Sequence, residues 1–197
     1  IGGVRRDILE DHRKATLKLV GELREEVTRL VSMLTTTPNF ESRTKGVGHL
    51  DRKVCRDFSP VGPMVRGSGF ARDVRFDHPF SGYKYIEGLK AHSADSCDVF
   101  GRTTVRIGEF LDSITMIEQL VNGLPSGPIL TQDFKYEPGK FAMGFTEAPR
   151  GEDMHWSMTG DNQKVYRWRA KAATYSNWPV LRYALQGNTV SDAAVII

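Results

Sequence analysis

The stretch DVFGRTTVRIGEFLDSITMIEQLVN, residues 98–122, decides the fold, because its apolar side chains recur at helical spacing. The wide apolar stripe consists of Ile107, Phe110, Leu111, Ile114, Ile117 and Val121. Gly123 and Pro125 follow it, and these residue types commonly end a helix. We therefore predict a helix over about residues 98–122 that turns one face toward a core.

A second long helix is predicted over about residues 8–35, where apolar residues again recur at spacings of three and four. Its stripe consists of Val20, Leu23, Val27, Leu30 and Leu34. Asp7 and Glu10 have the spacing of a capping box, and Pro38 disfavours helix in the residue before it. Fewer than about four clean heptads are present, which favours a core-lining helix over a coiled coil.

The segment of residues 39–97 has no helical or strand periodicity and is rich in glycine, proline and arginine. Because a loop of such length is unusual in a compact domain, we expect short helices and strands in it, packed against another element or a partner subunit. Its run GPMVRGSGFARDVR, residues 62–75, lacks both phosphate-loop signatures, so its glycines are expected to permit tight turns and close packing.

Residues 129–197 show a different pattern, with short segments separated by polar turns. Strands are predicted over Phe141–Phe145, Met154–Met158 and Val165–Arg169, and a short helix over Tyr175–Gln186, capped by Ser176 and closed by Gly187. The predicted fold class is therefore α+β and mainly α, with long core helices and a small antiparallel β unit. We treat residues 1–197 as a single domain.

Composition excludes several classes of protein. The net charge of +3 is too small to indicate nucleic-acid binding, and no apolar run reaches the roughly 20 residues of a membrane-spanning helix. The two cysteines, Cys55 and Cys97, are too few for a disulfide framework and are expected to be buried thiols in a reducing, cytoplasmic compartment. Both ends of the chain look cut, so we expect an internal fragment of a longer polypeptide.

Two segments could carry chemistry. In EAPRGEDMHW, residues 147–156, Pro149 and Gly151 hold Arg150 in a fixed position, where it could bind an anionic ligand or satisfy carbonyl groups at a corner of the domain. In YRWRAKAATYSNWP, residues 166–179, basic and aromatic residues alternate as in an RNA-binding surface. At strand periodicity, the same alternation is typical of a half-buried strand. The five histidines have no metal-site spacing.

Five segments together resemble the large subunit of nickel–iron hydrogenases of the formate hydrogenlyase type, which is related to the 49 kDa (D) subunit of respiratory complex I. They are IGGVRRD, GPMVRGSGFARDVRFDHPFSGY, SCDVFGR, EAPRGEDMHWSMTGDNQKVYRWR and NTVSDAAVII. The resemblance implies the central part of that subunit's fold and the reduction of protons to H2 with electrons from an iron–sulfur small subunit. It also implies a membrane-bound complex, peripheral to the inner face of the cell membrane. The alternative is the complex I subunit, which forms part of the quinone site without a metal.

In the family that the chain resembles, two CxxC motifs hold the nickel–iron centre, and neither motif is present here. The resemblance places one pair before Ile1 and the other after Ile197, while Cys55 and Cys97 do not match ligand positions. We therefore assign no metal ligand and no cofactor-binding residue to this chain. We expect the fragment alone to be inactive and to self-associate through uncovered apolar surface.

The resemblance carries over four residues that surround the metal without binding it. Arg150 matches the arginine suspended over the open coordination site, and Pro149 holds it there. Glu147 and His155 match positions that flank this wall. The glycine-rich run of residues 62–75 and Asp98 are given structural or subunit-interface roles. Gly101 stands where complex I relatives usually carry an aspartate, which weakens the quinone-site interpretation.

Overall fold

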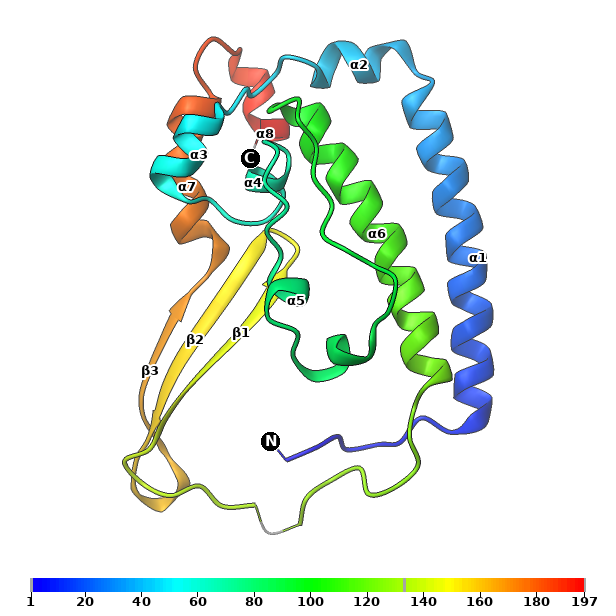
Figure 1. Cartoon of the computed structure of the whole chain (residues 1–197), viewed down its shortest axis with the longest axis vertical. Coiled ribbons are helices and arrows are strands. Elements are labelled where there is room, and N and C mark those ends of the chain that lie inside the picture. The colour runs from blue at the N-terminus through cyan, green and yellow to red at the C-terminus, as the bar shows by residue number, and fades with distance from the viewer. Residues whose placement is uncertain (1, 133, 197) are drawn as a thin grey trace.

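The computed structural model describes residues 2–132 and 134–196, and these form a mainly helical α+β fold with a three-stranded antiparallel sheet. Figure 1 shows two long helices on one side of the molecule and the sheet on the other, with a group of short helices joining them at one end. This arrangement confirms the predicted fold class.

The first long helix, α1 (Glu10–Thr35), confirms the predicted helix but has a different cap. Asp7 accepts a hydrogen bond from the backbone N–H of Ile8 at 2.8 Å, so the predicted capping box of Asp7 and Glu10 is wrong. Instead, Nδ1 of His12 accepts from the backbone N–H of Leu9 at 3.3 Å. The His12 side chain, one turn into α1, thus accepts a hydrogen bond from a backbone N–H group that has no partner within the helix.

The second long helix, α6 (Val99–Asn122), lies beside α1 and ends at Gly123 as predicted. Asp98 caps it by accepting a hydrogen bond from the backbone N–H of Gly101 at 2.9 Å. An ion pair between Arg24 and Glu118 joins the two helices at 2.7 Å. On α6, Ile114 and Val121 of the predicted stripe are buried, but Phe110 and Ile117 are exposed. On α1, three leucines of the stripe are exposed, namely Leu23, Leu30 and Leu34. Self-association through such surface stays a prediction.

The irregular segment contains short helices, as expected. They are α2 (Pro38–Thr44), α3 (Arg52–Phe58), α4 (Pro63–Arg66), α5 (Val74–Asp77) and the 3-10 helix η1 (Ser81–Tyr85). The strands that we also expected are absent from these described residues. Helix α4 packs on α6, so part of the segment is held by the chain's own long helix rather than by a partner.

The sheet consists of β1 (Phe141–Ala148), β2 (Gly151–Thr159) and β3 (Val165–Lys171), in that order and antiparallel throughout. The three predicted strands are thus confirmed and are longer than predicted. Glu147 lies opposite Glu152, and Ala148 lies opposite Gly151, which leaves two residues in the turn between β1 and β2. Every residue of β3 is exposed, so the prediction of a half-buried strand is wrong.

The C-terminal part contains η2 (Asp161–Gln163), α7 (Ala173–Ala184), η3 (Val190–Asp192) and α8 (Ala193–Ile196). Helix α7 begins after Ala172, which provides no side-chain cap, so the predicted cap at Ser176 is wrong. It packs on α3 and closes the main core. That core consists of Leu50, Cys55, Met64, Val65, Val99, Val180, Leu181, Ala184 and Ile196.

Both cysteines are buried free thiols, as predicted. Burial raises the pKa of the Cys55 thiol, which keeps it protonated at neutral pH. Among the described residues, no helix is long and apolar enough to span a membrane.

Candidate functional site

The turn between β1 and β2 is fixed by contacts from two other parts of the chain. The Asn177 side chain on α7 donates to the Arg150 carbonyl oxygen at 3.0 Å and accepts from the backbone N–H of Val61 at 2.8 Å. Gly62 has a positive φ of 68°, and a Cβ atom there would lie 2.3 Å from the Arg150 carbonyl oxygen. A glycine is therefore required at residue 62, and the backbone that carries Arg150 is held rigidly.

Arg150 is exposed in this chain. It lines two adjoining pockets, of about 520 and 230 Å³, that also share Arg106 and Met64. Arg102 of α6 and Arg43 of α2 line the larger pocket. We call this space the arginine pocket.

Three arginines of this pocket, the buried Arg102 and the exposed Arg106 and Arg150, make no ion pair with any residue that the structure describes. Arg43, in contrast, pairs with Asp192 at 3.1 Å. No carboxylate lines either pocket in the described part of the chain. The pocket therefore concentrates positive charge and N–H donors around an open space, which suits an anionic ligand.

Arg102 is the most deeply placed of the three, with 4% of its surface exposed. Its Nη2 donates to the carbonyl oxygen of Gly48 at 2.9 Å, while its Nη1 has no partner among the described residues. Burial lowers the pKa of Arg102 to about 10, and attraction to Asp98 only partly opposes this effect. Burial and then the charge of Arg150 also lower the pKa of Arg106. Attraction to Glu109 opposes this lowering at Arg106.

A second charged region, the buried ion cluster, borders a cavity of about 370 Å³ that Arg106 and Pro149 also line. It consists of Arg66, Asp73, Arg75, Glu109 and Glu147. Arg66 is 1% exposed and donates from Nη1 to Oε1 of Glu147 at 2.9 Å. Its Nε approaches Glu109 Oε1 to 2.5 Å without the alignment of a hydrogen bond. Arg75 donates from Nε to Oδ1 of Asp73 at 2.9 Å and from Nη2 to Oδ2 of Asp73 at 2.5 Å.

The structure brings only some of the predicted site residues together. Arg150 lines the arginine pocket, Pro149 lines a neighbouring cavity of about 370 Å³, and Glu147, near the end of β1, pairs with Arg66 in the ion cluster. His155 does not join them: its ring stacks on Trp168 with centroids 5.4 Å apart, and its Nδ1 accepts from the Trp168 Nε1–H at 3.0 Å.

The sequence analysis missed Arg102 and Arg106, which join Arg150 in the pocket. A signal was available, since these two residues are four apart on a predicted helix and so lie on one face. It also missed the ion cluster, because Arg66 and Glu147 are 81 residues apart in the sequence. No spacing rule connects residues so distant.

The donor set does not fit a nickel–iron centre held by this chain alone. Such a centre requires paired thiolates, and Cys55 and Cys97 are buried thiols that do not line the arginine pocket. In the described part of the chain, no three His, Cys, Asp or Glu side chains gather in a metal-binding arrangement. We therefore assign no metal ligand to any of these residues.

The chain belongs to the family described as "Respiratory-chain NADH dehydrogenase, 49 Kd subunit", which matches residues 1–143 and 132–197. Within that class, it is 56% identical over its whole length to formate hydrogenlyase subunit 5 of Escherichia coli K12. It is 53% identical to hydrogenase-4 component G of the same organism, again over the whole chain. The chain covers only 34% and 32% of those two proteins.

More distant relatives belong to the same fold. Bacterial NADH-quinone oxidoreductase D subunits are 28–32% identical. A solved structure of the membrane-bound sulfane sulfur reductase, an archaeal respiratory membrane complex, contains a similar chain with a TM-score of 0.88 and 27% identity. The match covers 99% of this chain and 55% of that one. All of these relatives are subunits of oxidoreductases.

Proposed function

We propose that the chain forms part of the large catalytic subunit of a formate hydrogenlyase-type nickel–iron hydrogenase, which reduces protons to H2 with electrons from an iron–sulfur partner. The observation that carries the proposal is the difference in identity between two groups of relatives. The hydrogenlyase and hydrogenase-4 subunits match the whole chain at 56% and 53%, whereas the quinone oxidoreductase subunits match at 28–32%.

In this proposal the arginine pocket is the wall of the active site that this chain supplies. Arg150, on a turn fixed by Asn177 and Gly62, presents planar N–H donors to small anionic ligands or to a group that gains negative charge. Arg106 adds a second positive charge beside it. The thiolates that bind the metal come from other parts of a longer subunit.

We further propose that this subunit works within a membrane-attached assembly of several subunits, at the inner face of the cell membrane. Support comes from relatives named membrane-bound hydrogenase subunit alpha, in Pyrococcus furiosus, and from the respiratory membrane complex of the solved structure. The long exposed stripe on α1 and the open face of β3 provide surface for such neighbours.

The alternative is a subunit of an NADH-quinone oxidoreductase whose pocket helps to bind quinone, without a metal. The family description supports this alternative. However, a pocket with three guanidinium groups that make no ion pair is poorly suited to an apolar quinone ring.

The test is to purify the complete complex and to measure H2 evolution with a reduced viologen, quinone reduction with NADH, and nickel content. The proposal predicts H2 evolution with about one nickel per complex. Quinone reduction without nickel and without H2 would establish the alternative.

A further inference from the structure

We infer that one face of the sheet formed by β1, β2 and β3 is the docking surface for an amphipathic helix of a neighbouring subunit, a helix that carries a row of carboxylates. This inference rests on the proposed function only in requiring an assembly of several subunits. It adds which surface of this chain is used and what chemistry the neighbour presents to it.

The register of the sheet places apolar and basic side chains in separate columns on this face. Residues directly opposite each other on neighbouring strands point to the same side of a sheet, as do alternate residues along one strand. One face therefore carries apolar side chains on β1 and β2 and cations on β3. In register, they are Phe141, Met143 and Phe145 on β1, Met158, Trp156 and Met154 on β2, and Arg167, Arg169 and Lys171 on β3. We call this the docking face.

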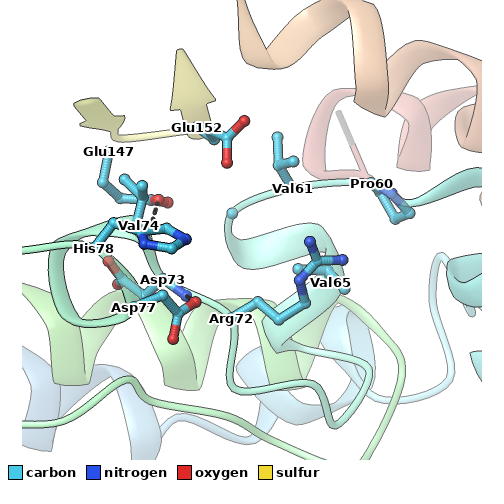
Figure 2. A pocket seen from close by; sticks show the side chains of 11 residues that line it. Pro60, Val61, Val65, Arg72, Asp73, Val74, Asp77, His78, Glu147 and Glu152 are labelled. Carbon is cyan, nitrogen blue, oxygen red and sulfur yellow. Dashed lines mark hydrogen bonds between the residues drawn. The ribbon is translucent and has the colours of Figure 1, made fainter. Parts of the chain in front are cut away.

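One end of the docking face is covered by the chain itself. Phe145 packs edge-on against His78 and Phe80, with ring centroids 6.1 and 5.9 Å apart. Beyond it, the cross-strand pair of Glu147 and Glu152 borders a cavity of about 90 Å³ that His78 also lines (Figure 2). This end of the face is therefore already used within the chain.

The other end of the docking face is open to solvent. Phe141 is 69% exposed and Met143 is 58% exposed, while Trp156 and Met158 beside them are half-buried. Trp156 stacks on Phe141 with ring centroids 6.1 Å apart. Figure 1 shows the sheet on one side of the molecule, with β3 at its outer edge. Large apolar side chains that gather in solvent in this way mark an interaction surface.

The cations of the docking face have no acidic partner. Arg167, Arg169 and Lys171 are exposed, and they make no ion pair within the described part of the chain. The sequence contains no acidic residue between Asp161 and Asp192 that could neutralise them locally. This column of positive charge therefore favours a partner with negative charge at the same edge.

A single α-helix that lies along the strands fits these columns. Three neighbouring strands span about 10 Å from the first to the third, and a helix with its side chains is about 10 Å wide. Alternate residues of a strand are about 7 Å apart, and every fourth residue of a helix is about 6 Å apart. A helix with carboxylates at every fourth position can therefore face all three cations while its apolar side covers β1 and β2.

Two other occupants fit the docking face less well. A second copy of the same face would bring apolar side chains but no carboxylate to the cations of β3. A lipid surface presents anionic groups all around an inserted apolar patch, whereas the cations of the docking face form one column at one edge. The pattern is that of a protein helix with one acidic side.

The test places the photoreactive residue p-benzoylphenylalanine in place of Phe141 in the complete, detergent-purified complex. Irradiation should join this subunit to a neighbouring subunit, and mass spectrometry should locate the link in a segment with apolar residues at helical spacing and Asp or Glu at every fourth position. The matched control carries the same residue in place of Trp168, which is exposed on the opposite face of the sheet. That control should not reach the same segment.

A second arm reverses two cations of the docking face, with Arg167→Glu and Arg169→Glu together. Retention of the linked neighbour at physiological ionic strength should fall about tenfold, because two attractions become repulsions. Lys14→Glu with Lys18→Glu makes the same change of charge on the exposed side of α1 and should leave retention unchanged. Replacement of two carboxylates of the linked segment by lysine should restore retention in the Arg→Glu variant.

A link from position 141 only to the same polypeptide, to a second copy or to lipid would overturn the inference, as would full retention of the neighbour in the Arg→Glu variant. If that variant does not assemble, the cross-link in the otherwise unchanged complex decides the matter. H2 evolution is measured on the same preparation. A complex that evolves no H2 but gives the expected link loses the proposed hydrogenase function and keeps the docking surface.

Discussion

The arginine pocket and the buried ion cluster differ in how their arginines are paired with carboxylates. In the cluster, Arg66 is buried and contacts three carboxylates within 3.5 Å. In the pocket, Arg102 is equally inaccessible but pairs with no carboxylate among the described residues. The arginines of the cluster have the carboxylate partners that buried charges require, whereas Arg102 in the pocket carries a positive charge without such a partner.

This difference distinguishes arginines that stabilise the fold from arginines that are available to bind a ligand. A buried cation with complete partners contributes to the fold, and its removal is costly because its carboxylates stay behind. A buried cation without partners costs stability and persists for another reason, of which ligand binding is the most direct. Three substitutions follow, from the largest expected effect to the smallest. Arg66→Met and Arg102→Met test this contrast, and Asp98→Ala tests the cap of α6, the helix that carries Arg102.

Arg66→Met should destabilise the chain by about 3–5 kcal/mol, because it leaves the carboxylates of Glu147 and Glu109 without their main positively charged partner. The free energy of unfolding from urea titration at neutral pH measures this effect. Arg24→Met is the matched control, since the Arg24–Glu118 pair is more than 30% exposed on both sides. That control should lose at most about 1 kcal/mol. Similar losses in both variants would show that the cluster is not a stabilising unit.

Asp98→Ala should lower the free energy of unfolding by about 2 kcal/mol at neutral pH, because it removes the cap of α6. Although burial opposes ionisation, hydrogen bonds from Ser96, Gly101 and Gly46 lower the pKa of Asp98 below its usual range. The carboxylate therefore stabilises the fold fully at neutral pH and loses this effect as the pH falls below about 4. The difference between the two proteins should shrink in acid, and a constant difference would contradict this account.

Arg102→Met should change the free energy of unfolding by less than about 1 kcal/mol. The variant loses the hydrogen bond to Gly48 but also removes a buried charge that has no carboxylate partner. Met keeps most of the packing of the long side chain. A loss as large as that of Arg66→Met would show that Arg102 is fully compensated within the chain.

Local patterns accounted for much of the fold. The stop at Gly123 and the three strands between Phe141 and Lys171 follow from periodicity and turn residues, which act between near neighbours. The prediction failed for the burial of β3, because burial depends on what covers a strand and not on its own alternation. It also failed for the cap of α1, where His12 took the place of Asp7.

Only site residues that lie in a turn motif or in a segment that resembles the family were predicted from the sequence. Arg150 and Pro149 were singled out because EAPRG is a recognisable turn; Arg150 lines the arginine pocket and Pro149 lines the neighbouring cavity of about 370 Å³, while their roles stay predictions. The ion cluster was not predictable, since Glu109 and Glu147 meet Arg66 only through the packing of α4 on α6 and of β1 on α5. A motif match did not place His155 beside Arg150: its ring stacks on Trp168 instead.

The most direct test of the central claim is the rate of H2 evolution per nickel by the complete complex that carries Arg150→Lys. Lysine keeps the charge but loses the planar fork of donors, so the account predicts a rate about a hundredfold lower, with nickel and iron content and melting temperature unchanged. A wild-type rate in that variant would contradict the claim that the arginine pocket is the wall of the active site.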